Sequence, residues 1–150
     1  MTCDEFWIKY KKETNQNENL KYNGEFSFGF DEKSITEMNS LVLAGLKKIM
    51  VTPLETYSID NSPVPRTGNH YVITGINEEP VCIIRDVDVS VMAFKDVTWQ
   101  IAKKDGEASS IEEWRENHKE YLEEEAEIVG FEFSENTPVV IEEFEVIYKA

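Results

Sequence analysis

Two groups of side chains in this sequence are of types that can do chemistry. Lys47 and Lys48 closely follow Gly45, at a point where a helix is expected to give way to a strand. Asp86 and Asp88 form a carboxylate pair within a β-prone segment. A lysine can act as a base when burial or a neighbouring cation lowers its pKa, and paired carboxylates can divide acid and base roles. These residues are the first candidates for a site.

The histidines and cysteines do not suggest a metal site. His70 stands alone, and His118 falls on the apolar stripe of a predicted helix, where a hydrogen-bonded core histidine is the more common case. Cys3 and Cys82 lack metal-ligand spacing and belong to no disulfide framework, so both are interpreted as free thiols. The sequence therefore predicts no metal and no cofactor.

Composition defines the class of protein more firmly than its activity. The chain has 150 residues, of which 41% are hydrophobic and 30% are charged, values typical of one soluble globular domain. No apolar run approaches the ~18–20 residues that a membrane span requires. The first residues lack the apolar core of a signal peptide. We therefore expect a cytoplasmic protein without membrane contact, and the sequence does not indicate its oligomeric state.

Net charge limits the possible partners. The chain has 30 acidic and 15 basic residues, which gives a formal charge of −15. Since nucleic-acid affinity depends on lysine and arginine neutralising phosphates, DNA binding is not expected, and RNA would need a local patch at Lys47, Lys48 and Arg66. Acidic residues dominate after Asp105. They are interpreted as a solubilising surface, with an acidic partner-binding face as the alternative.

Four segments have a capping residue followed by apolar residues at helical spacing, so each is predicted to be a helix. Ser34, Asp96 and Ser110 are the expected caps of the last three. Gly45 is expected to end the second helix, because the position after a last turn favours a left-handed conformation that glycine adopts freely. The predicted helices are residues 3–14, 34–44, 96–104 and 111–127.

Five segments are expected to be extended: residues 25–30, 49–57, 70–74, 81–94 and 138–149. Pro53 places the second at a sheet edge or at a bend. In the fourth, polar and apolar residues alternate, which predicts one buried and one solvated face. The expected buried face carries Val87, Val89 and Val91, and the solvated face carries Asp86, Asp88 and Ser90. Solvation of the aspartates is favoured over a catalytic pair.

The order of these elements favours an α+β fold. Strands separated irregularly by helices suggest a small, mostly antiparallel β-barrel with surrounding helices. A parallel α/β sheet is the alternative, but strands and helices do not alternate regularly and no glycine-rich phosphate loop follows the first strand. Residues 1–24 are expected to form an N-terminal helix and loop that pack on a domain of residues 25–150.

Several ordered segments resemble the ASCH-domain family, which belongs to the PUA-like barrel superfamily. They are PVCIIRDVDVSVMAFKDVT, GEASSIEEWRENHKEYL and GFEFSENTPVVIEEFEVIY, preceded by FSFG, LVLAG and PVPRTGNHYVI in the same order. The resemblance covers about Phe26 to Tyr148. It implies a PUA-like β-barrel with helices packed around it.

The resemblance also implies a chemistry. The family was proposed to bind RNA, one branch resembles an amidohydrolase acting on acetylated cytidine nucleosides, and another member is described as a ribonuclease. The amidohydrolase apparatus is a lysine, a threonine three places later and a glutamate just before a helix. Lys47 and Glu107 match the lysine and the glutamate, but Met50 stands at the threonine and Asn69 at a family aspartate. Thr52 is expected to share a strand face with Met50.

Two hypotheses about function follow. In the first, a small nucleoside-like or RNA-derived ligand binds in a pocket at the barrel mouth, and the chain hydrolyses the amide of acetylated cytidine-type nucleosides. Met50 then predicts weak or absent turnover, because it provides no hydroxyl nucleophile. In the second, the chain is a non-enzymatic module for RNA binding or protein interaction, with an ordinary ion pair at the same place. The first hypothesis makes Lys47 (as base) and Glu107 catalytic, and Lys48, Thr52 and Arg66 ligand-binding.

Overall fold

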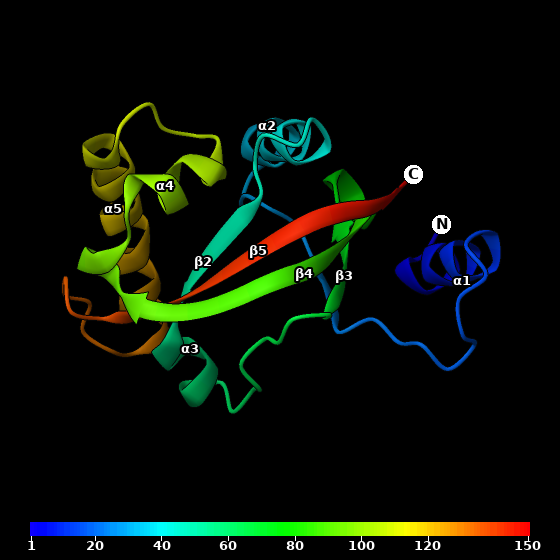
Figure 1. The fold of residues 1–150 in the computed structure, drawn as a ribbon, viewed down its shortest axis with the longest axis horizontal. Helices are drawn as coiled ribbons and strands as arrows, with labels where there is room; N and C mark the ends of the chain where they lie inside the picture. The colour runs from blue at the N-terminus through cyan, green and yellow to red at the C-terminus, as the bar shows by residue number, and fades with distance from the viewer. The chain divides into compact units, whose positions relative to one another are not determined.

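The structure of the protein, a computed structural model, describes residues 1–150. Figure 1 shows the helices and strands in their order along the chain. The helices are α1 (Cys3–Glu13), α2 (Glu32–Leu43), α3 (Leu54–Ile59), α4 (Trp99–Ala102) and α5 (Ile111–Val129), with short 3₁₀ helices η1 (Ile76–Glu78), η2 (Phe94–Asp96) and η3 (Lys103–Asp105). The strands are β1 (Gly24–Phe26), β2 (Ile49–Pro53), β3 (His70–Thr74), β4 (Pro80–Ala93) and β5 (Pro138–Lys149).

The five strands form one sheet in the order β1-β3-β4-β5-β2. The β2–β5 and β3–β4 pairs are antiparallel, and β1 runs parallel to β3. Because β1 and β2 are the two outer strands, the sheet is a half-barrel rather than a closed barrel. The expected α+β, PUA-like fold is confirmed in this open form. Pro53 lies in β2, an edge strand, where its missing N–H breaks no inner ladder.

The chain divides into two compact units. The first consists of Met1–Leu46, Thr67–Val87 and Phe144–Ala150, and the second consists of Lys47–Arg66 and Asp88–Glu143. In the first unit, the Thr2 hydroxyl caps α1 by accepting a hydrogen bond from the Glu5 backbone N–H. The α1 residues Phe6 and Trp7 then pack against Val72 and Ile83 of β3 and β4. The helix predicted for residues 3–14 is confirmed.

The start of α2 differs from the prediction. Asp31, not Ser34, is the N-cap: its carboxylate accepts from the Ser34 backbone N–H at 2.7 Å, and the Ser34 hydroxyl accepts from the Asp31 N–H at 3.1 Å. An aspartate is as good a cap as a serine, so the reciprocal pair forms one turn earlier. The predicted end is confirmed, since Gly45 follows the helix with a φ of 74°.

The predicted faces of β4 are wrong around Asp86. This side chain is only 1% exposed, whereas Val87 is 41% exposed. Side chains alternate along a strand, so the fully buried Cys82 and Ile84 place Asp86 on the buried face two residues further on. Both faces are covered at Cys82, Ile83 and Ile84, and Asp86 is the last buried residue of the strand, so alternation in the sequence does not show how far along β4 the coverage extends. Asp88 is exposed, as expected.

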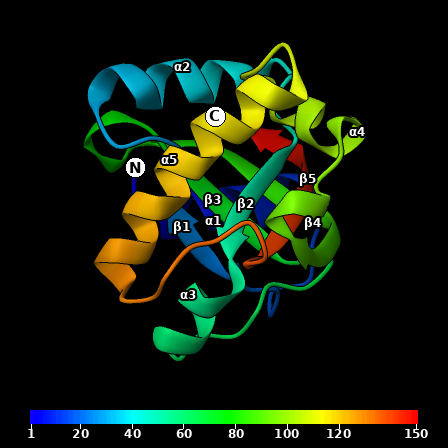
Figure 2. The same ribbon diagram turned by 90° about the vertical axis from the view of Figure 1, so that its left-hand side faces the viewer.

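The second unit has its core where α5 packs on two antiparallel strands. Ile49 and Val51 of β2 and Val139 and Ile141 of β5 meet Trp114 and Leu122 of α5. Figure 2 shows α5 and β2 side by side, with α5 running obliquely to the strand. Burying apolar side chains of this size contributes roughly 1.5–3 kcal/mol each. This core fixes α5, which carries part of the site described below, against β2.

Two predicted segments of the second unit are divided differently. Residues 49–57 are not one strand: β2 ends at Pro53, which is the N-cap of α3, and the helix begins at Leu54. Proline keeps the residue before it extended, so the helix cannot begin earlier. Residues 96–104 are not one helix either, since Val97 has an extended conformation between η2 and α4, and Thr98 rather than Asp96 precedes α4.

No helix of the chain has both the length and the apolar character needed to cross a membrane.

Candidate functional site

Lys47 stands just before β2, and a backbone hydrogen bond fixes its neighbour. The Lys48 N–H donates to the Lys104 carbonyl oxygen at 2.7 Å. This bond ties the start of β2 to η3 and brings Lys47 beside Asp105, 58 residues further along the chain. The Lys47 side chain is 6% exposed, so its ammonium group is almost completely removed from water. A buried ammonium requires carboxylate partners.

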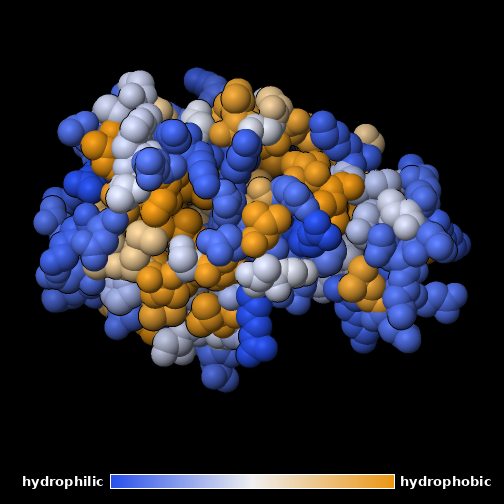
Figure 3. Space-filling model, viewed as in Figure 1, coloured by the Kyte–Doolittle hydropathy of each residue, from blue (hydrophilic) through white to orange (hydrophobic).

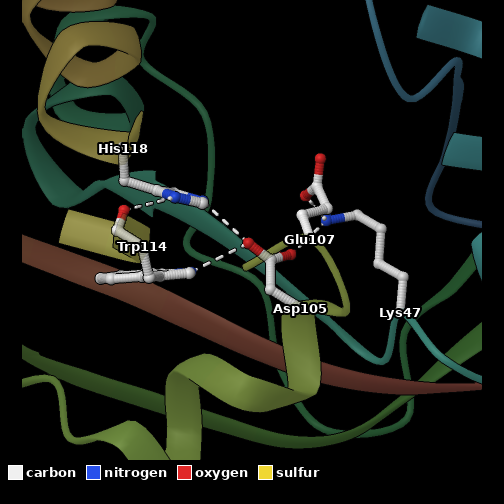
Figure 4. Close-up of polar contacts among 5 residues, drawn as sticks. All are labelled: Lys47, Asp105, Glu107, Trp114 and His118. Carbon is white, nitrogen blue, oxygen red and sulfur yellow. Dashed lines mark hydrogen bonds and ion pairs between the residues drawn. The ribbon is translucent and has the colours of Figure 1, made fainter. Parts of the chain in front are cut away.

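Two carboxylates supply those partners from one tight turn. Asp105 ends η3, Gly106 follows with a φ of 74°, and Glu107 comes next. The left-handed glycine reverses the backbone, so that both acidic side chains reach the same lysine. Lys47 Nζ contacts Asp105 Oδ1 and lies 3.1 Å from Glu107 Oε2 (Figure 4). Asp105 is buried at 1% exposure, whereas the Glu107 side chain is 27% exposed.

Helix α5 holds the other oxygen of Asp105. The Ser110 hydroxyl caps α5, as predicted, by accepting from the Glu113 backbone N–H. Trp114 and His118 are four residues apart and therefore lie on one face of the helix. Their Nε1 and Nε2 atoms contact Asp105 Oδ2 at 3.0 Å and 2.9 Å (Figure 4). Their rings stack with centroids 4.2 Å apart and planes 19° apart.

The charges of this cluster stabilise one another. Burial alone would lower the pKa of Lys47, but Asp105 and Glu107 raise it above its ordinary value overall. Burial would raise the pKa of Asp105, yet the hydrogen bond from His118 and the charge of Lys47 hold it well below its usual range. Lys47 is therefore an ammonium ion and Asp105 a carboxylate at neutral pH.

The structure brings together two of the five predicted site residues. Lys47 and Glu107 are in direct contact, and the second carboxylate beside Lys47 belongs to Asp105, which is not one of the five. Lys48 and Arg66 are exposed. Thr52 is half-buried and shares a face of β2 with Met50, as expected, while Ile49 and Val51 form the opposite, buried face. The base role predicted for Lys47 needs a lowered pKa, and the structure raises it instead.

Three residues of the cluster were not identified as site residues from the sequence. In the sequence, Asp105 falls between the helices predicted for residues 96–104 and 111–127, and Trp114 and His118 fall within the second of them. Trp114 is fully buried, and its indole N–H binds Asp105. The signal that could have found them is the four-residue spacing of an indole and an imidazole just after an Asp-Gly-Glu turn.

The arrangement presents a fixed cation beside a partly exposed carboxylate. Such a pair can hold a polar, uncharged group, with the ammonium near an oxygen and the carboxylate near a donor. Lys47 already faces two carboxylates, so it offers little attraction to a phosphate. The structure contains no group of three or more His, Cys, Asp or Glu side chains arranged to hold a metal ion.

Comparison with known proteins adds the family. The family model for the ASCH domain matches residues 25–148. Protein EF3133 from Enterococcus faecalis V583 has a similar structure, with a TM-score of 0.90 and 22% identity over 97% of this chain and 88% of that one. The ASCH domain from Lactobacillus crispatus JV V101 is 27% identical over 97% of this chain and 93% of that one, with a TM-score of 0.85.

No curated protein matches the chain. The family match nevertheless spans most of the 150 residues, and the fold is the same in both solved structures. The chain belongs to the ASCH domain family.

Proposed function

We propose that the protein binds a small, uncharged, amide-bearing ligand of the nucleoside type beside the Lys47–Glu107 pair and hydrolyses its amide slowly. The observation that carries the proposal is the contact between Lys47 Nζ and Glu107 Oε2, which lie 3.1 Å apart. The Lys47 side chain is buried, and the Glu107 side chain is 27% exposed. A ligand that reaches Glu107 meets the ammonium group directly behind it. The nucleoside part of the proposal rests on the family resemblance.

The raised pKa of Lys47 gives this residue a different role from that of a base. As a permanent cation it polarises the carbonyl oxygen of the amide and stabilises the negative charge that develops there. A preformed charge in a water-poor site is effective because it needs no reorganisation during the reaction. Lys47 in this role also orients the ligand.

Glu107 is the group that can accept a proton. One carboxylate oxygen contacts Lys47, and the other points away from it (Figure 4). A carboxylate in this position can take a proton from a water molecule as that water attacks the carbonyl carbon, and can pass it to the leaving amine. Since the reaction uses water directly, it does not require the hydroxyl that Met50 lacks. Without a covalent intermediate we expect it to be slow.

RNA binding by a basic patch has less support. The long helix α5 exposes a row of glutamates, which would repel a phosphate backbone. Figure 3 shows a mainly hydrophilic surface at the left-hand edge, where Figure 1 places α5. The exposed acidic residues of this helix are Glu112, Glu113, Glu116, Glu120, Glu123, Glu124 and Glu127.

The test is an assay of N4-acetylcytidine hydrolysis with the wild type and single variants. We expect weak turnover in the wild type, none in Glu107→Gln, and a large loss of turnover in Lys47→Met. Met50→Thr supplies the hydroxyl found in the amidohydrolase branch, and faster turnover is expected if it faces the same ligand. Lys95→Gln, which removes an exposed cation outside the cluster and outside the predicted ligand-binding residues, is the matched control.

The outcomes separate the two hypotheses on function. Turnover that survives Glu107→Gln would refute the assignment of the proton acceptor. Absence of turnover in every variant, together with absence of nucleoside binding by calorimetry, would favour a non-enzymatic module. Tight, salt-sensitive binding of arbitrary RNA would instead show that the acidic surface does not prevent contact with phosphates.

A further inference from the structure

Asp105 connects two groups of side chains through its two oxygens. Oδ1 contacts the Lys47 ammonium. Oδ2 accepts hydrogen bonds from Trp114 Nε1 at 3.0 Å and His118 Nε2 at 2.9 Å. Helix α5 therefore fixes the orientation of the carboxylate, and the carboxylate in turn fixes the position of the ammonium. A carboxylate with three donors is rigid, because any rotation breaks at least one of the contacts.

The contacts of His118 depend on its proton. Its Nδ1 lies 3.2 Å from the Trp114 backbone carbonyl oxygen, and its Nε2 lies 2.9 Å from Asp105 Oδ2. Both partners are acceptors, so only the doubly protonated imidazolium donates to both. A neutral ring donates from one nitrogen and turns the lone pair of the other toward an oxygen. Loss of the proton must therefore weaken one of the two contacts.

Two further contacts of the His118 ring are with groups that attract a cation. It stacks on the Trp114 indole with centroids 4.2 Å apart, an arrangement that attracts a cation. The carboxylate of Asp105, with a side chain only 1% exposed, faces it as a counter-charge. The His118 side chain is 17% exposed, so the ring is partly accessible to solvent.

We infer that Asp105 and His118 are positioning residues for the site proposed above: the His118 imidazolium, together with the Trp114 indole, holds Asp105 so that Lys47 stays beside Glu107. When His118 loses its proton, Asp105 is held less firmly and Lys47 is no longer fixed. The inference depends on the proposed function only for the ligand, because the coupling between His118 and Lys47 is a property of the free protein.

The charged groups around His118 determine the direction of the effect. Asp105 faces it from η3, Lys47 and Glu107 lie beyond Asp105, and on α5 itself Tyr121 follows one turn later. The Tyr121 hydroxyl interacts electrostatically with Glu125, Lys47 and Glu107. The charged groups near His118 therefore extend one turn further along α5. With His118 protonated, two cations balance Asp105 and Glu107; without that proton the group carries a net negative charge. Because the loss of this proton also loosens the contact that holds Asp105 and Lys47, ligand binding is expected to weaken as the pH rises.

The test uses nitrogen-15 NMR of the Lys47 ammonium group and of the His118 ring over a pH titration. Protected, hydrogen-bonded ammonium groups give observable signals, so the free protein can be studied without a ligand. We expect the Lys47 signal to shift and broaden over the same pH range in which the His118 ring nitrogens titrate. In His118→Gln this pH dependence should disappear. It should persist in His70→Gln, which removes the only other histidine.

A Lys47 signal that stays constant while His118 titrates would overturn the inference, and this measurement needs only the wild type. A shift that is unchanged in His118→Gln would overturn it equally. Calorimetry with N4-acetylcytidine tests the consequence for the site. Affinity in the wild type should fall about tenfold when His118 is deprotonated, within the usual range for two coupled sites. No binding at any pH would refute the proposed ligand, whereas NMR coupling would still support the positioning role.

Discussion

Lys47 and Asp105 form an ion pair that is almost completely withdrawn from solvent, with side chains 6% and 1% exposed. Removing one member of such a pair leaves an uncompensated buried charge. We therefore expect Asp105→Ala to lower the free energy of unfolding by about 3–5 kcal/mol. Urea denaturation followed by circular dichroism measures this loss.

The matched control is an ion pair on the surface. Arg85 and Glu145 are in contact, but their side chains are 45% and 47% exposed. Water screens such a pair, so Glu145→Ala is expected to change the free energy of unfolding by less than about 1 kcal/mol. Equal losses in the two variants would mean that burial of the Lys47–Asp105 pair has no energetic consequence.

Asp105 also gives the stability a dependence on acid pH. In the folded protein its pKa lies below the ordinary value of 3.8, because the His118 hydrogen bond and the Lys47 charge outweigh the effect of burial. At pH values between the folded and the unfolded pKa of Asp105, the unfolded chain binds more protons than the folded protein does. The free energy of unfolding therefore rises with pH in this range. The contribution is complete above about pH 4 and is lost as the pH falls through the folded value.

Urea midpoints measured between about pH 6 and pH 2 check this sign. Asp105→Asn removes the titrating group and should show a shallower acid loss than the wild type. Identical acid profiles would show that other carboxylates account for the whole effect.

The N-cap of α5 should matter because this helix carries Trp114 and His118. The Ser110 hydroxyl accepts a hydrogen bond from the Glu113 backbone N–H at 3.1 Å. Ser110→Ala is expected to cost about 1 kcal/mol of unfolding free energy, because that N–H loses its partner. Ser109→Ala is the control, since the exposed Ser109 hydroxyl binds only the Glu113 side chain. Equal effects would contradict the assignment of the cap.

Helix α1 should be part of the folded core although the family match begins at residue 25. Phe6 is 2% exposed and packs with Val72 and Ile83. Phe6→Ala is expected to cost about 3–5 kcal/mol through the cavity it leaves. Ile8, on the same helix and 47% exposed, provides the control variant Ile8→Ala. A negligible effect of Phe6→Ala would show that the helix is dispensable for folding.

No metal is expected to be needed for stability, since the sequence contains no paired histidine or cysteine ligands. Metal analysis of the purified protein should find less than stoichiometric zinc, and chelation should leave the melting temperature unchanged. Stoichiometric zinc that is lost together with stability would refute this.

Much of the fold follows from short-range signals in the sequence. Ser110 as a cap, Gly45 as a helix end and β5 at Pro138–Lys149 could all be predicted because each depends on residues close in the chain. Errors arose where two local signals competed. Asp31 and Ser34 are both good caps, and only the surrounding structure selects the earlier one.

The sequence by itself determined the class of fold, the family, most helices and strands, and two members of the candidate site. Only the tertiary structure decided that Asp86 of β4 is buried and that Asp105, which His118 contacts, lies beside Lys47. The physical reason is the separation along the chain of the residues that interact. Capping and alternation act over a few residues, whereas the Lys47–Asp105 contact joins positions 58 residues apart. Such contacts form only when packing of α5 against β2 brings distant segments together, and the charges and hydrogen bonds brought together in this way shift the pKa values of Lys47 and Asp105 against the effect of burial.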